Sequence, residues 1–511
     1  MTNKIKKISL FQRFLNGIEV VGNALPHPAT LFLLFALLTL VVSGLGGLLS
    51  WQVAHPATHE IIPVKNLLSV DGLHFILQKT VTNFTSFAPL GIVLVAMLGI
   101  GIAEKSGLIG VVIRLLVLSS PRKYLTFVVV FAGVMSNAAS DVGYVLLIPL
   151  AGVIFLAVGR HPIAGMAAAF AGVSGGFSAN LLIGTIDPLL AGLSQEAAQI
   201  IDPTYQVNAT ANYYFMVVST FLIAFAGTFV TEKIVIPRLG EYHSDEVIPE
   251  KLEQLSKLEK KGLLWATLIF GIYMLIILAG AIPEDGFLRG PDGSLLKSPL
   301  LDGVVTLLFF VAGSAGIAYG VAVGKFKNDT DVMNGMADSM KTMATYLVLV
   351  FFAAQFVAYF KESNLGIYVA VTGAEALMAA DLNIYVLMVM FIFFAGSVNM
   401  VMGSASAKWA IMAPIFVPIF MLMGYSPELS QAVFRIGDSV TNIISPMMSF
   451  FALIITFVHK YDKKAGIGTI ISVMIPYTIV FTILWTLLLF VWIYFELPLG
   501  PGVELYYTKP E

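Results

Sequence analysis

Apolar runs of about 20 residues, separated by short polar turns, recur along the whole chain. A helix of that length crosses the hydrocarbon core of a bilayer, so the pattern predicts an all-α polytopic membrane protein. The predicted spans are 29–51, 88–108, 123–136, 142–159, 163–183, 213–236, 263–282, 301–324, 344–360, 384–400, 410–424, 430–458 and 467–494. Several of them are short or interrupted by Gly and Pro. We therefore predict about nine true crossings and interpret the remaining runs as half-spanning arms of hairpins.

Lysine and arginine gather in some loops only, which predicts the orientation because cytoplasmic loops carry an excess of these residues. The basic clusters are Lys4, Lys6, Lys7 and Arg13; Arg114, Arg122 and Lys123; the stretch from Lys233 to Lys261; Lys325 and Lys327; and Lys460, Lys463 and Lys464. The segment 188–210 has neither Lys nor Arg. With the clusters inside, the N-terminus is cytoplasmic, the C-terminal tail is outside, and 237–262 is a cytoplasmic linker between two halves.

The two halves share a spacing of proline, glycine and phenylalanine. Pro149, Phe155, Gly159 and Pro162 return at one constant offset as Pro414, Phe420, Gly424 and Pro427. Upstream, the tripeptide Phe-Ala-Gly precedes Asn137 in one half and Asn399 in the other. The charge pattern places the matching spans in opposite directions across the membrane. Inverted-topology repeats with interrupted helices are an architecture of secondary transporters, which bind substrate where the repeats meet.

Polar residues lie at membrane depth in the second half, where each ionisable group costs at least about 2.5–3.5 kcal/mol and needs a reason. The segment 396–406 combines small residues with the amide of Asn399 and the hydroxyl of Ser406, and it leads to Lys408 and Trp409. We expect a hairpin tip there. Trp409 could instead belong to the aromatic belt at the membrane surface.

The next span contains Arg435 and Asp438, three residues apart. Gly437 and Pro446 predict an unwound stretch inside this span, with exposed carbonyl oxygens. Such oxygens suit a hard cation such as Na⁺, and a carboxylate there can alternatively carry a proton. The alternative for Arg435 and Asp438 is a structural ion pair on one helix face.

Similar segments occur in the first half. Residues 136–141, which include Asn137 and Asp141, resemble a hairpin tip, and 175–188, which includes Asp187, resembles a broken helix. Unwound backbone at membrane depth is tolerated where it lines a cavity or is buried in protein. Asp187 could also be a simple turn residue, and Asp141 could cap the following helix.

Composition narrows the class of protein further. Charged residues make up 12% of the chain, against about 25% in a typical soluble domain. A net charge of −2, spread over short loops, gives no support to nucleic-acid binding, and the lack of cysteine excludes a thiolate metal site. The segment 172–176 fits a G-x-S-x-G nucleophile pattern, but all seven histidines fall in loops or at span ends. An intramembrane hydrolase is therefore disfavoured, and His161 is expected to be an ordinary loop residue.

Several motifs resemble the AbgT family of aminobenzoyl-glutamate transporters and antimetabolite efflux pumps. They are Pro26 to Pro28, Asn83-Phe84, Phe87 to Gly91, Gly159 to Pro162, Gly403 to Ala410, Ala413 to Pro418 and Phe434 to Ser439. The resemblance implies a homodimer of nine-span subunits with two re-entrant hairpins and an elevator-type architecture, driven by a Na⁺ or H⁺ gradient. It implies substrate or coupling roles for Asp187, Ser406, Trp409, Pro427, Arg435 and Pro446, and cation ligation by Asn399 and Asp438. Asn137 joins the substrate or coupling set through its matched placement, whereas Lys408 departs from the family pattern.

These expectations combine into one hypothesis. The chain is expected to be a secondary transporter, not an enzyme, in the bacterial inner membrane, importing aminobenzoyl-glutamate or exporting sulfonamide-type compounds without a cofactor other than a coupling ion. Its predicted divisions are 1–87, the repeats 88–236 and 344–494, the linker and scaffold 237–343, and the tail 495–511. The alternatives are a transporter of dicarboxylates or other organic anions and a passive channel.

Overall fold

The computed structural model describes residues 26–54, 60–139, 142–242, 254–296, 298–463 and 465–507. The predictions for Lys4, Lys6, Lys7, Arg13 and Asp141, and for residues 243–253 of the linker, lie outside these ranges.

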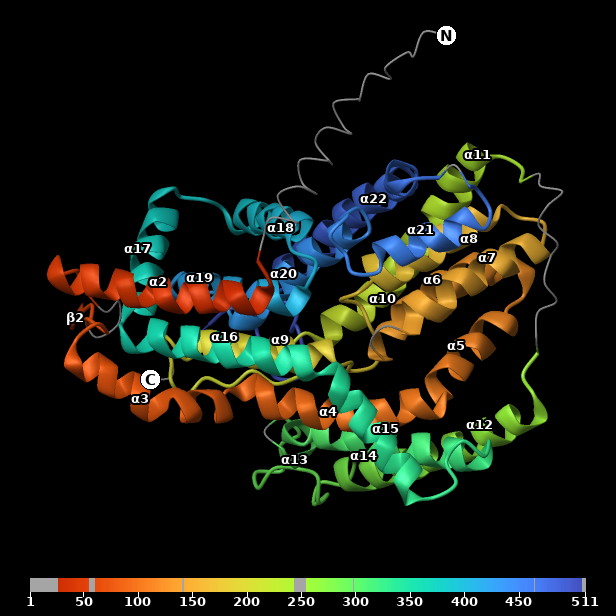
Figure 1. Ribbon diagram of the computed structural model, residues 1–511, viewed down its shortest axis with the longest axis horizontal. Coiled ribbons are helices and arrows are strands. Elements are labelled where there is room, and N and C mark those ends of the chain that lie inside the picture. Colours follow the sequence, from red (N-terminus) through yellow and green to blue (C-terminus); the bar gives the residue numbers. More distant parts are fainter. Residues whose placement is uncertain are drawn as a thin grey trace, which may run out of the picture.

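The described chain is almost entirely helical (Figure 1). The longer helices are α2 (Pro28–Leu48), α3 (Val70–Thr85), α4 (Ala88–Ser106), α10 (Tyr213–Val230), α12 (Lys257–Ala281), α14 (Val304–Ala322), α16 (Ala344–Glu362), α17 (Leu365–Ala379), α18 (Ile384–Val401), α19 (Ala405–Leu422), α20 (Pro427–Asn442) and α22 (Ile467–Tyr494). The shorter ones are α5 (Leu108–Leu118), α6 (Leu125–Ser136), α7 (Ile148–Ala157), α8 (Pro162–Phe170), α9 (Ile186–Ala198), α11 (Ile236–Leu239), α13 (Pro299–Asp302), α15 (Asp329–Thr342) and α21 (Phe451–His459). One small antiparallel hairpin pairs β1 (Gln52–Ala54) with β2 (Ile61–Pro63).

Nine helices of the described chain are long and apolar enough to cross a membrane, which confirms the predicted number. One of them runs from Val70 to Ser106 through α3 and α4, and α2 and α16 pack side by side along the same direction (Figure 1). A further pair, α5 and α6, bends by 111° at its break. A group formed by α12, α14 and α15 packs on α4 at one side of the molecule. Glycine allows α4 and α14 to approach each other closely, because a Cβ on Gly99 would lie 2.5 Å from the Cα of Phe309.

The span predictions missed α3, α5, α9, α15 and α17, and they placed the start of α12 too late. Helix α15 carries three aspartates in the described chain, so it lacks the long apolar run that identified the other helices. Helix α12 begins at Lys257, inside the predicted linker, because Ser256 and Glu259 form a capping box. The linker is therefore shorter than 237–262.

The two segments with matching sequence fold into the same turn. Gly159 and Gly424 both have positive φ, at 77° and 89°. In each turn the next residue donates back to a phenylalanine carbonyl, Arg160 N to Phe155 O at 2.8 Å and Tyr425 N to Phe420 O at 2.9 Å. This is a helix C-cap that needs glycine in the left-handed region. The shared spacing thus reports shared local structure.

His161 follows the first of these turns and caps α8. Its Nδ1 accepts a hydrogen bond from Ile163 N at 3.2 Å, and its ring meets Tyr242 edge-on at 5.2 Å. Burial lowers the pKa of His161, and the nearby Asp462 carboxylate opposes this shift. The loop position confirms the prediction, with a capping role added.

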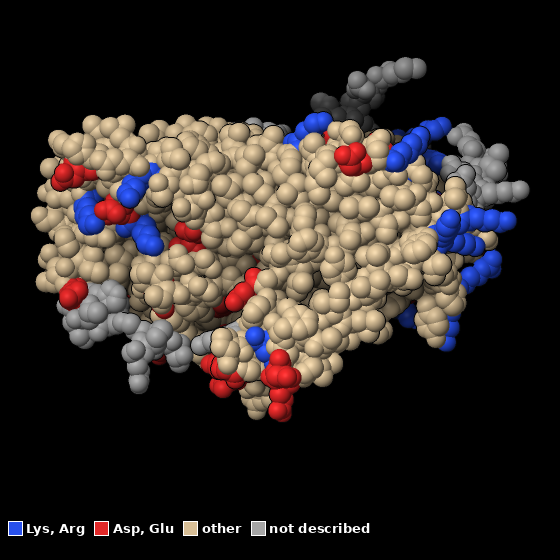
Figure 2. Space-filling model, turned by 90° about the horizontal axis from the view of Figure 1, so that it is seen from below, with Lys and Arg blue, Asp and Glu red and all other residues tan. Residues whose placement is uncertain are grey.

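The charged surface is uneven along the long axis. Figure 2 shows a face that is mostly uncharged, with Lys and Arg crowded at the end that carries α5, α11 and the start of α12 in Figure 1. The opposite end carries both signs, including the exposed pair Lys65–Glu362, whose atoms are 3.0 Å apart. This distribution agrees with the clusters seen in the sequence.

Candidate functional site

Helix α20 carries a polar stripe through the buried centre of the protein. It consists of Glu428, Gln431, Arg435, Asp438 and Asn442, which are three or four residues apart and therefore share one face. All five are buried, and α20 is packed between α9, α18, α19 and α22. The helix begins where Ser426 accepts from Leu429 N at 3.2 Å and Pro427 occupies the first helical position. A buried polar stripe demands partners, and other helices supply them.

Arg435 pairs with Asp187 at the first turn of α9. Its Nη2 donates to Asp187 Oδ1, and both side chains are 3% exposed. The other carboxylate oxygen of Asp187 accepts from Gly184 N at 2.7 Å, while Arg435 Nη1 contacts Met216 Sδ at 2.7 Å. Arg435 Nε has no hydrogen-bond partner among the described residues. The structure thus brings together two predicted site residues, Arg435 and Asp187, that are far apart in the sequence.

Trp409 of α19 contacts both α9 and α20 and is fully buried. Its ring stacks on Phe434, with centroids 4.6 Å apart, and its Nε1 donates to Ser194 Oγ at 3.0 Å. Gln431 Nε2 donates to the same hydroxyl at 2.8 Å. Trp409 therefore does not belong to an interfacial belt.

The second centre forms around Asp438. Asn399 Nδ2 lies 2.8 Å from the Asp438 carbonyl, from Thr441 Oγ1 and from Asn442 Oδ1, so its amide oxygen faces the other way. Lys408 Nζ contacts that oxygen, Asn399 Oδ1, and also Asp438 Oδ1. The Lys408 side chain has no exposed surface, and that of Asp438 is 1% exposed. Asp438 is paired with Lys408 and Arg435 with Asp187, so the alternative ion pair along the helix is wrong.

Two helix interruptions meet next to this centre. The chain leaves helix at 402–404, between α18 and α19, and again at 443–450, between α20 and α21. Gly403 lies so close to Met447 that a Cβ would overlap the Met447 carbonyl oxygen. Ser445 Oγ donates to Asn399 O at 3.0 Å across the same contact. The two broken segments therefore pack on each other beside Asn399.

One predicted break is in a different place. Gly437 was expected to unwind the span, but α20 is helical through it. A Cβ at this position would overlap the Ile392 carbonyl oxygen of α18, so Gly437 allows two helices to approach. The interruption follows at 443–450 and includes Pro446, as that residue predicted. Likewise, α18 stays helical through Val401, so the chain leaves the helix at 402–404 and not along the whole of 396–406.

The other predicted residues lie at the edges of the two centres. Ser406 Oγ is 3.2 Å from Ser404 Oγ, and Ser404 caps α19 by accepting from Ala407 N at 3.3 Å. In the first half, Asn137 is buried, and its Nδ2 donates to Gly176 O at 3.4 Å. Asn399 reaches the carbonyl of Asp438 over the same sequence separation of 39 residues.

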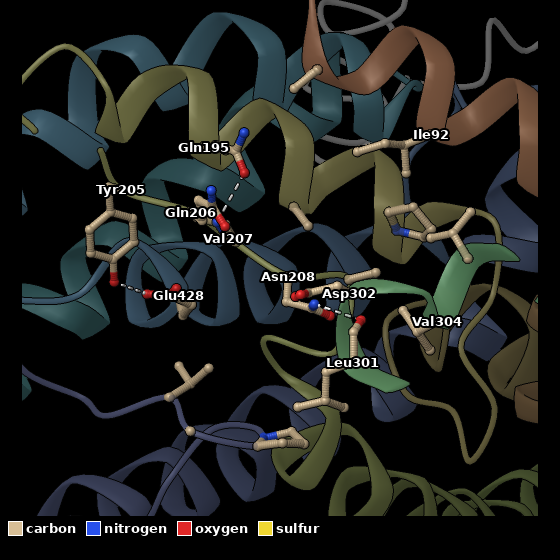
Figure 3. Close-up of a pocket in the computed structure, with 18 of the residues that line it drawn as sticks. Ile92, Gln195, Tyr205, Gln206, Val207, Asn208, Leu301, Asp302, Val304 and Glu428 are labelled. Carbon is tan, nitrogen blue, oxygen red and sulfur yellow. Dashed lines mark hydrogen bonds between the residues drawn. The ribbon is translucent and has the colours of Figure 1, made fainter. Parts of the chain in front are cut away.

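A cavity of about 1140 Å³ lies along one side of α9, and Figure 3 shows part of its wall. Pro188, Ala191 and Gln195 of α9 line it, so it approaches the Asp187–Arg435 pair. The other lining segments are 85–88, 91–92, 95, 205–209, 296, 301–302, 304–306, 428, 501–504 and 506–507. Within the described chain the lining includes acidic residues but no Lys, Arg or His.

Figure 3 shows the Tyr205 hydroxyl directed at Glu428, to which it donates at 2.9 Å. Burial and the adjacent Glu428 raise the pKa of Tyr205, which keeps the phenol a donor. Asn208 Nδ2 donates to the Leu301 carbonyl at 2.9 Å and ties the 205–209 segment to the opposite wall.

Sequence reasoning missed several partners. Ser194, Asn212 and Gln431 form a chain in which Asn212 Nδ2 donates to Gln431 Oε1 at 2.6 Å and Gln431 donates to Ser194. Single polar residues in apolar runs gave the only signal, and they carry no motif. The period of three and four along α20 could have identified Glu428 and Gln431 with Arg435 and Asp438.

The oxygen atoms around Asn399 and Asp438 fit a monovalent cation better than a transition metal. No group of three or more His, Cys, Asp or Glu in the described part of the chain is arranged to hold a metal ion. The second centre instead offers one carboxylate, one amide oxygen and nearby carbonyls, the hard oxygen ligands that suit alkali and alkaline-earth cations.

Comparisons with known proteins agree along the whole length. The sequence model described as "AbgT putative transporter family" matches residues 13–507. The p-aminobenzoyl-glutamate transport protein of Escherichia coli K12 is 37% identical over 487 residues, 95% of this chain and 96% of that protein. The structure is similar to the Alcanivorax borkumensis YdaH transporter, with a TM-score of 0.89, 47% identity, and coverage of 93% of this chain and 100% of that one. It is also similar to Neisseria gonorrhoeae MtrF, of a class of antimetabolite efflux pumps, with a TM-score of 0.91, 52% identity, and coverage of 96% and 100%.

Proposed function

Because the chain belongs to the AbgT transporter family, we propose that it is a secondary active transporter of aromatic, folate-related compounds. The family and its relatives are transporters and not enzymes, as the sequence predicted. The substrates are of two kinds, aminobenzoyl-glutamate, which the Escherichia coli relative is named for, and sulfonamide-type antimetabolites.

The observation that carries this proposal is the environment of Arg435. A guanidinium has five N–H donors, and here one bonds a carboxylate, one meets a thioether, and Nε has no partner among the described residues. A buried donor without a partner costs about 1–3 kcal/mol, so a ligand oxygen that reached it would recover that energy. The planar fork matches a carboxylate, while Phe434, the residue before Arg435, and Trp409, which stacks on it, supply aromatic surface.

The cavity beside α9 supplies the route. With the basic end of the molecule in the cytoplasm and the N-terminus there too, the segments at 296–306 and 501–507 face the exterior, and so does the cavity that they line. Its carboxylates Asp302 and Glu504 repel a dianion that approaches from that side. This lining favours efflux of weakly charged sulfonamide-type compounds over uptake of aminobenzoyl-glutamate.

The architecture of the proposal is an inverted repeat with two re-entrant hairpins, moving by an elevator-type step in a homodimer of the bacterial inner membrane. Its support is the pair of matching turns at Gly159 and Gly424. A cation gradient, of Na⁺ or H⁺, drives transport, with Asn399 and Asp438 as the cation ligands. Saturable flux that requires a gradient separates this function from a passive channel.

Counterflow in proteoliposomes tests the proposal, with labelled aminobenzoyl-glutamate and a labelled sulfonamide, under Na⁺ and pH gradients imposed separately. Arg435→Lys keeps the charge and loses the fork. Because a hydrogen bond to a charged group contributes about 1.5–3 kcal/mol, the half-saturating concentration of aminobenzoyl-glutamate should rise about tenfold or more, with a smaller change for the sulfonamide.

The matched control is Arg160→Lys. Arg160 pairs with Glu232 away from α20, 2.5 Å apart, so this variant should transport both substrates normally. Equal losses on both substrates in Arg435→Lys would count against direct binding. A preference for aliphatic dicarboxylates over both aromatic substrates would instead support the organic-anion alternative.

A further inference from the structure

The ammonium of Lys408 lies between the two side chains that the proposed function assigns as cation ligands. It contacts Asn399 Oδ1 and Asp438 Oδ1, the same oxygens that a metal cation would use. On the basis of the proposed function, we propose that Lys408 and Na⁺ are alternative occupants of this one site. Binding of Na⁺ then requires the lysine side chain to withdraw.

The position of Lys408 within its own helix is unfavourable for a positive charge. It lies in the first turns of α19, four residues after the cap Ser404, at the helix end where positive charge is disfavoured. Its side chain is also fully buried, where a charge is costly unless it is paired. Asp438 is the one carboxylate that the described structure places against it. The lysine therefore depends on the site, and not on its own helix.

The geometry of Asn399 leaves room for one cation. Its amide nitrogen is committed to Asp438 O, Thr441 Oγ1 and Asn442 Oδ1, which fixes Oδ1 toward Lys408. Asp438 supplies a single negative charge, and the Asn442 amide donates to its second oxygen at 3.3 Å. One carboxylate neutralises one positive charge, and two cations on the same pair of oxygens would repel each other strongly at this depth.

The surroundings allow the lysine to withdraw. Its stem of four methylenes is flexible, and the helix break at 402–404 lies within two turns of it. Ser404 in that break is exposed, so an ammonium that leaves the site has a polar outlet nearby. The interruption at 443–450 packs on the same break through Gly403 and Met447, and its Ser445 hydroxyl reaches the Asn399 carbonyl.

The first half lacks both members of the pair. At the offset that relates Pro149 to Pro414, Lys408 and Asp438 correspond to Gly143 and Val173. These two are also neighbours, because a Cβ on Gly143 would lie 2.9 Å from Val173 Cγ2. The same pair of positions is therefore in contact in both halves, once as glycine and valine and once as an ion pair.

The test is a Na⁺ titration of the purified full-length chain in detergent, followed by the midpoint of thermal unfolding, with choline chloride holding ionic strength constant. Lys408→Met removes the tethered cation at similar size. We expect the Na⁺ concentration for half-maximal stabilisation to fall at least tenfold relative to the unchanged chain. Lys105→Met is the matched control, since Lys105 pairs with Asp338 at the surface, 2.8 Å away, and should not alter the Na⁺ response.

Two further variants test whether the effect of Na⁺ arises at this site. Lys408→Met with Asp438→Asn should lose the response to Na⁺, which locates the effect. If Lys408→Met folds poorly, Lys408→Gln, which retains an amide donor toward Asn399, should show the same fall in the half-maximal Na⁺ concentration. An unchanged half-maximal concentration, or no stabilisation by Na⁺ in either single variant, would overturn the proposal. Because no substrate or gradient is present, this result stands apart from success or failure of the transport assay.

Discussion

The Asp187–Arg435 pair permits a quantitative prediction, because the two side chains have unequal support. When Asp187→Asn removes the negative charge, a single amide oxygen replaces the two carboxylate oxygens that accept from Arg435 Nη2 and Gly184 N, and the guanidinium is left without its counter-ion. When Arg435→Gln removes the guanidinium, Asp187 still accepts from Gly184 N at 2.7 Å and lies in the first turn of α9, where the helix end favours negative charge.

Removing one partner of a buried ion pair costs about 3–5 kcal/mol, because the other charge is left uncompensated. We expect Asp187→Asn to reach that range. Arg435→Gln should cost about 1–2 kcal/mol less, since hydrogen bonds to a charged group are worth about 1.5–3 kcal/mol and Asp187 retains one. The double variant has no buried charge at this point, so its cost should fall short of the sum of the single variants by about 2 kcal/mol or more.

The assay is the free energy of unfolding of the purified chain in mixed micelles, measured for the unchanged protein, both single variants and the double variant. Distant, independent sites add to within about 0.5 kcal/mol. Additivity at that level would refute the reasoning, since the pair would then contribute no coupling. A larger cost for Arg435→Gln than for Asp187→Asn would refute the claim about unequal support.

Three further predictions concern the fold. Gly437→Ala should destabilise the protein by about 1–3 kcal/mol, because the added Cβ overlaps a carbonyl of α18. Gly271→Ala is the control and should be neutral or stabilising, because a Cβ there meets nothing within 4 Å. The free energy of unfolding in micelles compares the two variants. Gly159→Ala and Gly424→Ala should each cost about 1–2 kcal/mol, and markedly different costs would contradict their equivalence. The lowered pKa of His161 means that the unfolded chain binds the proton first, so stability should be full above about pH 6.5 and decline below it. His161→Asn, which keeps a cap, should weaken this dependence in thermal unfolding between pH 8 and 5, and an identical profile would exclude His161 as its source.

The composition and the long apolar runs were sufficient to predict the class of protein and the number of crossings. Hydrophobic length has a direct physical meaning in a bilayer, so this inference needs no knowledge of packing. The matched glycines and prolines also predicted shared local structure, because a left-handed cap after a helix requires Gly159 and Gly424 in their own segments.

Helix interruptions were predicted less well where glycine was the signal. Pro446 lies in a real break, since proline removes a backbone donor whatever surrounds it. Gly437 does not break its helix, and Gly396 does not begin a tip. Glycine permits a break and also permits close packing, and only the neighbouring helix decides between the two.

The sequence by itself determined that Arg435, Asp438, Asn399 and Trp409 are buried polar or aromatic groups in need of partners, because lipid offers none. Only the tertiary structure decided which partner each one has. In the structure Arg435 pairs with Asp187 and Asp438 pairs with Lys408, although Arg435 and Asp438 lie within one turn of the same helix. Burial makes a polar group costly at any position, but the group that relieves this cost arrives from another helix, at a sequence distance that no local pattern encodes.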